Sequence, residues 1–257
     1  MAPQREAPSL LSPDHVLHTI AHDLSRRFIG VFAAETVERY VFESYTALAR
    51  TSKITSHLPS VTERFARDRL TALAQSKGLA PHDVPEVLLV CVQNAGRSQM
   101  GAALLDHHAA GRVHVRSAGS TPSSALHPRA MEVMPEVGID LAAAYPKPLT
   151  DDVVRAADVV ITMGCGDACP IHPGKRYEDW DLRDPADSSL EEARQIRNEI
   201  DARVRQLLNE IVPALTTSPH GSGARLGATR RTPELPSNRG SPAKQLLDGS
   251  LRLPIGS

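Results

Sequence analysis

The chain has 257 residues, of which 41% are hydrophobic, and its formal net charge is −1. The balanced charge provides no basic field for nucleic acid, and the absence of an apolar run of about 18 residues argues against a membrane span. The start of the chain lacks the basic-then-apolar pattern of a secretory signal, so we expect a cytoplasmic protein. Three cysteines do not make a disulfide framework in a chain of this length. We therefore expect them to be buried fillers, metal ligands, or nucleophilic and redox-active thiols.

Residues 1–84 carry three amphipathic patterns that predict helices. The first pattern covers residues 12–30 and the second covers residues 34–50. The third begins with the capping-box pair Ser60 and Glu63. Because the connections between the three patterns are short, we predict a small three-helix bundle, and we assign it to a first domain.

From Glu86 onward, short apolar runs of strand length alternate with helical patterns. Such alternation predicts a parallel sheet with helices on both faces. The expected strands cover residues 86–92, 113–119, 157–164 and 175–182, and the expected helices cover residues 98–111, 127–138 and 189–212. Pro135 lies inside one helical pattern and is expected to shorten or kink that helix. We therefore assign residues 85–215 to an α/β domain.

Residues 216–257 are rich in Pro, Gly, Ser and Arg and contain few apolar side chains. Such a segment cannot bury enough surface to offset its chain entropy, so we predict a disordered tail. Its mildly basic character would allow contacts with anions, but a solvated tail is the simpler interpretation.

The stretch VLLVCVQNAGRSQM places Cys91 at the end of the first predicted strand, directly before a loop and a helix. Small loop residues let backbone N–H groups point inward, and such a loop at a helix amino terminus binds a tetrahedral oxyanion. Arg97 can donate two parallel hydrogen bonds to the oxyanion, and Ser98 can donate one to the nucleophilic Cys91 thiolate. The candidate oxyanion-binding residues are Val92, Gln93, Asn94, Ala95, Gly96 and Arg97. The alternative is an inert buried cysteine followed by a surface arginine.

Asp184 precedes Pro185 in the predicted loop between the last strand and the last helix. A thiolate that attacks an oxyanion centre needs a general acid to protonate the departing oxygen. Because loops at the carboxyl edge of a parallel sheet converge, Asp184 can reach the site and is our candidate acid. The alternative is an ordinary Asp-Pro turn.

Three segments together carry a resemblance to a known family: CVQNAGRS, SAGSTP (residues 117–122) and DPAD. They resemble the low-molecular-weight protein tyrosine phosphatase superfamily, and residues 86–212 are similar to the arsenate reductases within it. The segment MGCGDACPIHPGKRYEDWDLRDPA is similar to a characteristic segment of those reductases. The first 84 residues also resemble a helical domain fused to some actinobacterial-type arsenate reductases. The resemblance implies a four-stranded parallel sheet flanked by helices, preceded by the three-helix bundle.

Two departures from the phosphatase pattern favour a reductase. Those phosphatases typically have an aromatic residue after Asp-Pro, where this chain has Ala186, and often a second loop cysteine, where this chain has Gly96. The chain instead has Cys165 and Cys169, and this spacing would place both sulfurs on one face of a helix. A strained disulfide between them would be of the labile, catalytic kind.

The resemblance implies a cysteine relay that detoxifies arsenate. In that scheme Cys91 attacks arsenic and Asp184 protonates the leaving oxygen. Cys165 then attacks the Cys91 sulfur and releases arsenite, and Cys169 moves the disulfide to the Cys165–Cys169 pair. Thioredoxin is the expected reductant, with a mycothiol- or glutaredoxin-type system as the alternative. No bound cofactor is expected, and residual phosphatase activity is possible on the shared loop.

Other interpretations of the same residues stay open. Cys165, Cys169 and His172 have a zinc-like spacing, although a fourth ligand is not evident nearby. The two later cysteines could also be small core residues. Some thioredoxin-coupled relatives bind potassium through an acidic residue eleven places after the nucleophile; this chain has Ala102 there, so we do not predict that ion. The remaining alternatives are a phosphatase and a non-enzymatic arsenic-sensing module.

Overall fold

The computed structural model describes residues 13–52, 57–164 and 169–212. All of these residues belong to one compact unit within residues 1–216. The predicted tail, the first predicted cap Ser12 and Cys165 lie outside the described residues. No helix in the described ranges is long and apolar enough to cross a membrane.

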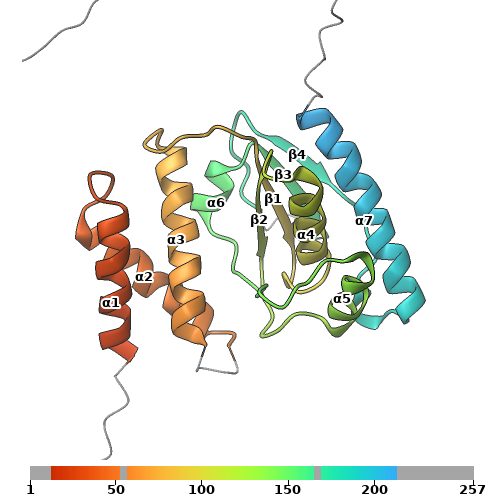
Figure 1. Ribbon diagram of the computed structural model, residues 1–257, viewed down its shortest axis with the longest axis horizontal. Helices are drawn as coiled ribbons and strands as arrows, with labels where there is room; N and C mark the ends of the chain where they lie inside the picture. Colours follow the sequence, from red (N-terminus) through yellow and green to blue (C-terminus); the bar gives the residue numbers. More distant parts are fainter. Residues whose placement is uncertain (1–12, 53–56, 165–168, 213–257) are drawn as a thin grey trace, which may run out of the picture. The chain divides into compact units, whose positions relative to one another are not determined.

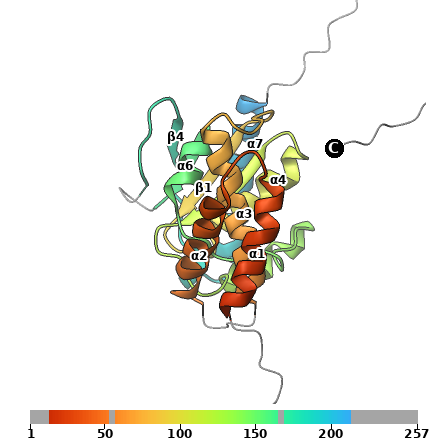
Figure 2. The same ribbon diagram turned by 90° about the vertical axis from the view of Figure 1, so that its left-hand side faces the viewer.

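The three expected amino-terminal helices are present as α1 (Pro13–Arg27), α2 (Ala34–Ala49) and α3 (Leu58–Ser76) (Figure 1). Their apolar stripes meet in one buried cluster, formed by Leu17, Ala21, Leu24, Phe28, Val37, Tyr40, Val41, Ala66 and Leu70. Figure 2 shows α1 and α2 side by side in front of α3. The predicted start of the third helix is wrong. Because Pro59 occupies the first turn, the helix begins at Leu58, and Ser60 lies inside it without acting as a cap.

The sheet confirms the predicted parallel four-stranded architecture. Its strands are β1 (Glu86–Cys91), β2 (His114–Gly119), β3 (Val159–Met163) and β4 (Arg176–Asp179), in the order β2-β1-β3-β4. All neighbouring pairs are parallel, and Cys91 at the end of β1 pairs with Gly119 on β2 and Met163 on β3. Since β1 is central and covered on both faces, all six of its residues are buried, which explains the uninterrupted apolar run of residues 87–91 after Glu86.

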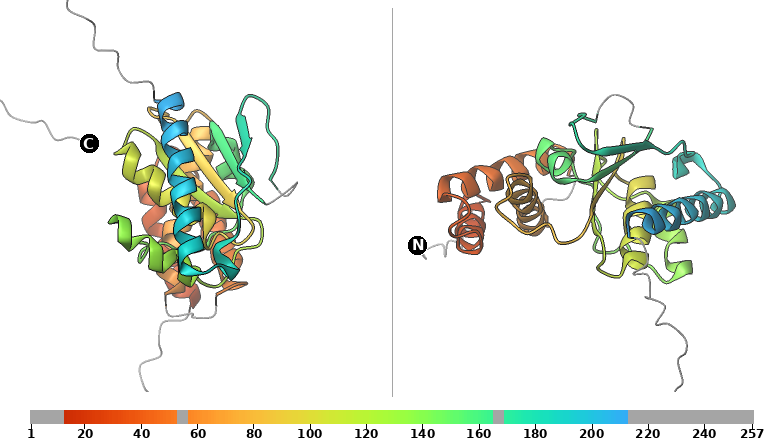
Figure 3. Two further views of the ribbon diagram at one scale, coloured as in Figure 1. Left: turned by 90° about the vertical axis from the view of Figure 1, so that its right-hand side faces the viewer. Right: turned by 90° about the horizontal axis from the view of Figure 1, so that it is seen from above.

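Helices cover both faces of the sheet, and successive residues of β1 point to opposite faces. Leu89 and Cys91 pack in a cluster with side chains of α4 (Arg97–Ala109), α5 (Pro128–Val133) and α7 (Leu190–Ile211). Leu88 and Val90 pack in a second cluster with α6 (Asp151–Ala156) and with Ala72 of α3. Figure 3 shows α4 and α7 on one side of the sheet and α6 and α3 on the other. Helix α3 therefore belongs both to the bundle and to the covering of the sheet.

Buried polar contacts fasten α3 to the α/β layer. The Arg69 guanidinium donates to both carboxylate oxygens of Asp152 on α6, at 3.3 and 3.4 Å, and to the Ser44 hydroxyl at 3.2 Å. On β1, the buried Glu86 carboxylate accepts from Gln75 of α3 at 2.5 Å and from Arg116 of β2 at 3.1 Å. These pairs satisfy charges that burial would otherwise make costly.

Two features of the remaining helices follow from local chemistry. The expected interruption at Pro135 is confirmed, since α5 ends at Val133 and a 3-10 turn, η1 (Pro135–Val137), replaces the rest of the helix. Helix α7 begins with a full capping box between Ser189 and Glu192. Helix α6 was not predicted, because six residues are too few to display a helical period.

Candidate active site

Cys91 lies at the carboxyl edge of the sheet and opens the Cys91 loop, defined as residues 91–98. Its side chain is buried, with 2% of the residue exposed. The Cys91 Sγ lies 2.9 Å from the Ser98 Oγ and accepts the Asn94 backbone N–H at 3.2 Å. The structure thus brings Cys91 and Ser98 together, as the sequence analysis expected, with donors placed to stabilise a thiolate.

Asn94 organises the interior of the loop. Its backbone is left-handed, with φ of 47°, a conformation that asparagine tolerates better than most residues. The fully buried side chain donates to the Ser98 Oγ at 2.8 Å and accepts from the Gln99 Nε2 at 2.9 Å and from the Lys147 backbone N–H at 2.8 Å. The sequence predicted Asn94 as one of the oxyanion-binding residues but not its role inside the loop, and it gave no indication of Gln99 and Lys147. The tolerance of Asn for positive φ was the one local signal.

The outer side of the loop is bonded to the segment that follows β2. The carbonyls of Val92, Gln93 and Ala95 accept backbone N–H groups of Thr121, Ser123 and His127 at 2.8, 3.0 and 2.9 Å. With these carbonyls turned outward, the loop N–H groups and the amino terminus of α4 remain for an anion. The close packing of residues 117–122 on the loop explains why the SAGSTP segment has a glycine at position 119. A Cβ on Gly119 would lie 2.8 Å from the Val92 carbonyl oxygen and 2.9 Å from Asn94 atoms, so this close approach requires glycine.

Arg97 and Asp184 meet at the mouth of the loop. The Arg97 guanidinium donates to an Asp184 carboxylate oxygen at 2.5 Å and to the Leu182 carbonyl at 3.1 Å. The other Asp184 oxygen caps the 3-10 turn η3 (Pro185–Asp187) by accepting the Ala186 N–H at 3.0 Å. The Arg97 side chain is 10% exposed, whereas that of Asp184 is 52% exposed. Asp184 is therefore within reach of both the loop and the solvent.

The later cysteines are placed differently. Cys165 lies outside the described residues. Cys169 is buried in the cluster on the α3 and α6 face of the sheet, whereas the Cys91 side chain belongs to the cluster on the opposite face. His172, named in the zinc alternative, binds an Asp151 carboxylate oxygen at 2.8 Å through its Nε2. Over the described ranges, no three His, Cys, Asp or Glu side chains gather as metal ligands.

Two family models match the chain. One, described as "Protein-tyrosine-phosphatase-like, N-terminal domain", matches residues 17–74, which include most of α1 to α3. The other, described as "Low molecular weight phosphotyrosine protein phosphatase", matches residues 86–215, about half of the chain, and contains the whole Cys91 loop and Asp184.

Solved and curated relatives agree with these matches. The structure of the Corynebacterium glutamicum thioredoxin-dependent arsenate reductase is 53% identical, has a TM-score of 0.69, and aligns over 76% of this chain and 96% of its own. The glutaredoxin arsenate reductase of Synechocystis is 37% identical over 129 residues, 49% of this chain and 98% of that protein. The arsenate reductase of Shouchella clausii is 34% identical over 130 residues, 47% of this chain and 92% of that protein. The likeness to the Corynebacterium protein covers more of the chain than the α/β layer alone.

Proposed function

Because the chain belongs to the low molecular weight phosphotyrosine protein phosphatase family, we propose that it uses the family's oxyanion loop to reduce arsenate to arsenite. The observation that carries this proposal is the 53% identity to a thioredoxin-dependent arsenate reductase over 96% of that protein. Ala186, next to Pro185 at the mouth of the loop, also offers no aromatic face for a phosphotyrosine ring.

Arsenate binding involves the loop N–H groups and Arg97. The oxyanion competes with Asp184 for the guanidinium, since Arg97 donates to Asp184 at 2.5 Å in the structure. Bidentate contact with the substrate releases the Asp184 carboxyl group, which then takes a proton from the solvent that reaches it. Binding thus sets free the general acid that the next step needs.

In the first chemical step the Cys91 thiolate attacks arsenic and forms an S–As bond. One arsenate oxygen leaves as water after Asp184 has supplied a proton. The hydroxyl of Ser98, 2.9 Å from the Cys91 Sγ, and the N–H of Asn94 stabilise the thiolate before the attack and the sulfur as a leaving group afterwards. Arsenic remains pentavalent in this adduct.

Arsenic is reduced in the second step, with electrons from the thiols. The Cys165 thiolate attacks the Cys91 sulfur, an S–S bond forms, and the electron pair of the S–As bond passes to arsenic, which leaves as trivalent arsenite. The Cys169 thiolate then attacks the Cys165 sulfur and frees the Cys91 thiolate. Because Cys169 packs on the face of the sheet opposite the Cys91 side chain, the relay requires the Cys169 side chain to leave that cluster during turnover.

The Cys165–Cys169 disulfide must be reduced by an external dithiol, and we propose thioredoxin. The similar Corynebacterium protein is named a thioredoxin-dependent arsenate reductase, which supports this choice. A glutaredoxin- or mycothiol-type system is the alternative, since one relative is named a glutaredoxin arsenate reductase. No bound cofactor takes part in this scheme, because the three thiols and the external dithiol supply all the electrons.

The test is arsenate-dependent oxidation of NADPH in the presence of thioredoxin and thioredoxin reductase. Wild type should turn over, and Cys91→Ser, Cys165→Ser and Cys169→Ser should each reduce turnover to background. No turnover by wild type with either thioredoxin or glutaredoxin would contradict the reductase, and activity of Cys169→Ser with thioredoxin would contradict the relay. Hydrolysis of p-nitrophenyl phosphate without arsenate reduction would instead identify a phosphatase.

A further inference from the structure

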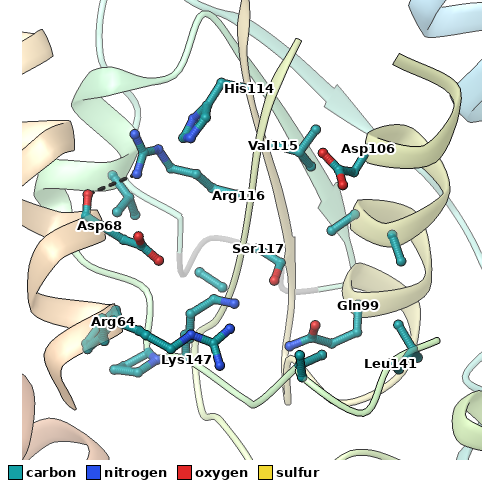
Figure 4. Close-up of a pocket in the computed structure, with 18 of the residues that line it drawn as sticks. Arg64, Asp68, Gln99, Asp106, His114, Val115, Arg116, Ser117, Leu141 and Lys147 are labelled. Carbon is teal, nitrogen blue, oxygen red and sulfur yellow. Dashed lines mark hydrogen bonds between the residues drawn. The ribbon is translucent and has the colours of Figure 1, made fainter. Parts of the chain in front are cut away.

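A cavity of about 410 Å³ lies around the outer edge of β2 and reaches Gln99, the residue that follows the Cys91 loop. Its walls come from α3, from β2, from α4 and from the segment of residues 140–148 (Figure 4). Arg64 and Asp68 enter from α3, Ser117 from β2, Gln99 from α4 and Lys147 from the last segment. The amino-terminal helices therefore supply one wall, and the α/β layer supplies the others.

Two partly buried cations line this cavity, and neither forms an ion pair with a carboxylate in the described part of the chain. The Arg64 guanidinium and the Lys147 ammonium make no ion pair or side-chain hydrogen bond there, and both lie over the Tyr145 ring, at 4.9 and 4.8 Å from its centre. Burial lowers the pKa of Lys147 to about 8, with Asp68 opposing this shift and Arg64 adding to it. Both side chains are partly buried, and neither is neutralised by an ion pair, so both are free to bind an anion from outside the chain.

The other polar groups of the cavity indicate which kind of anion can bind there. Ser117 lines the cavity and adds a hydroxyl group, which can donate a hydrogen bond to an anion. Asp68 adds a carboxylate, which repels a fully deprotonated anion but accepts a hydrogen bond from an O–H group. Hydrogen phosphate and hydrogen arsenate carry such a group at neutral pH, and sulfate does not.

We propose that this cavity is a second oxyanion site, in which Arg64 and Lys147 bind hydrogen phosphate or hydrogen arsenate while Asp68 accepts a hydrogen bond from the O–H group of the anion. The site is separate from the Cys91 loop and does not rest on the reductase chemistry, because binding alone defines it. It also gives the amino-terminal helices a function, since Arg64 and Asp68 both come from α3.

The second site is connected to the first through short contacts. The Lys147 backbone N–H donates to Asn94 at 2.8 Å, and the Lys147 carbonyl accepts from the Gly119 N–H at 2.8 Å. Gln99, another wall residue, donates to Asn94 and to the Tyr145 carbonyl, both at 2.9 Å. An anion that restrains Lys147 also restrains the interior of the Cys91 loop, so occupancy should favour binding at the first site.

The test is calorimetric titration of the full chain with inorganic phosphate and with sulfate. Arg97→Met removes the loop site, and this variant should still bind phosphate. Adding Lys147→Met or Arg64→Met should weaken that binding at least tenfold, whereas Arg67→Met, a control on the same helix that does not line the cavity, should leave it unchanged. Phosphate should bind several-fold more tightly than sulfate, and Asp68→Asn should remove this preference.

Three results would overturn the proposal. They are phosphate binding to Arg97→Met that neither Lys147→Met nor Arg64→Met weakens, no phosphate binding to Arg97→Met, and sulfate binding as tight as phosphate binding. Two variants in different segments of the chain protect the test against one that does not fold, and far-UV circular dichroism checks each of them. All of these measurements are made without turnover, so they are independent of whether the protein reduces arsenate.

Discussion

The Cys91 loop and the Asp184 turn face each other at the mouth of the site, but they are held in very different ways. The interior of the Cys91 loop is buried and receives hydrogen bonds from α4, from the segment after β2 and from Lys147. Asp184 is half exposed and is held by Arg97 and by its own capping bond. The comparison shows that the oxyanion-binding part of the Cys91 loop, called the cradle below, is arranged before the substrate binds. The position of the Asp184 carboxyl group, in contrast, depends on what Arg97 binds.

This difference has a chemical reason. A cradle of backbone N–H groups stabilises developing charge best when it needs no rearrangement during the reaction. An acid, by contrast, must exchange its proton with water in every cycle. Substitutions in the two regions should therefore have different effects. Those in the cradle should weaken oxyanion binding, and those in the Asp184 turn should lower kcat.

The largest effect is expected for Asp184→Asn. Loss of the general acid should lower kcat about 10²- to 10⁴-fold. Oxyanion affinity should stay the same or rise, because no carboxylate then competes for Arg97. Steady-state kinetics and phosphate titration measure the two quantities. The matched control is Asp187→Asn, an exposed carboxylate in the same turn, which should change neither. Equal losses for both variants would contradict an acid role for Asp184.

Gly119→Ala should damage the cradle. The new Cβ would lie 2.8 Å from the Val92 carbonyl oxygen, and backbone atoms would have to move. We expect a loss of about 1–3 kcal/mol in the free energy of unfolding, together with weaker phosphate binding. Gly174→Ala is the control, because that glycine has a φ of +81° but nothing within 4 Å of its Cβ position. It should lose stability without losing phosphate affinity, and the same behaviour in Gly119→Ala would argue against a prearranged cradle.

Tyr145→Ala tests whether the amino-terminal helices support the cradle. The Tyr145 ring packs against Leu48, Leu58 and Phe65 of those helices, while its carbonyl accepts from Gln99. Removing the ring should cost about 2–4 kcal/mol of stability and weaken phosphate binding several-fold. Tyr145→Phe should be neutral or stabilising, because the Tyr145 hydroxyl is buried without a hydrogen-bond partner in the described structure. A destabilised Tyr145→Phe would contradict this description of the contact.

The last effect concerns the charge of Lys147 and its dependence on pH. Its pKa is about 8 in the folded protein and 10.5 ordinarily, so between these values the unfolded chain binds more protons. The destabilisation caused by the charged ammonium is therefore fully present below about pH 8 and disappears as pH rises toward 10.5. Lys147→Met should unfold at higher urea concentration than wild type at pH 7, and the difference should shrink by pH 10. A difference independent of pH would contradict a depressed Lys147 pKa.

The sequence by itself determined the parallel α/β architecture and the composition of the Cys91 loop. A central strand covered on both faces is mostly apolar, as residues 87–91 are. The loop is a continuous segment, and the local backbone and charge explain its glycine, asparagine and arginine. The pairing of Cys91 with Ser98 could be foreseen for the same reason, since one loop contains both. Ser60 shows the limit of such local signals: its capping pattern was present, but the chain began the helix before it.

Only the tertiary structure decided what surrounds that loop. Gln99, Tyr145 and Lys147 carry no motif, yet they hold Asn94 and its neighbours from segments far along the chain. The same is true of α3, which has the pattern of a bundle helix but packs on the sheet through Ala72 and brings Arg64 to the cavity. Contacts between distant segments depend on how whole elements pack, and a periodic pattern records only that a face is buried, not which partner covers it.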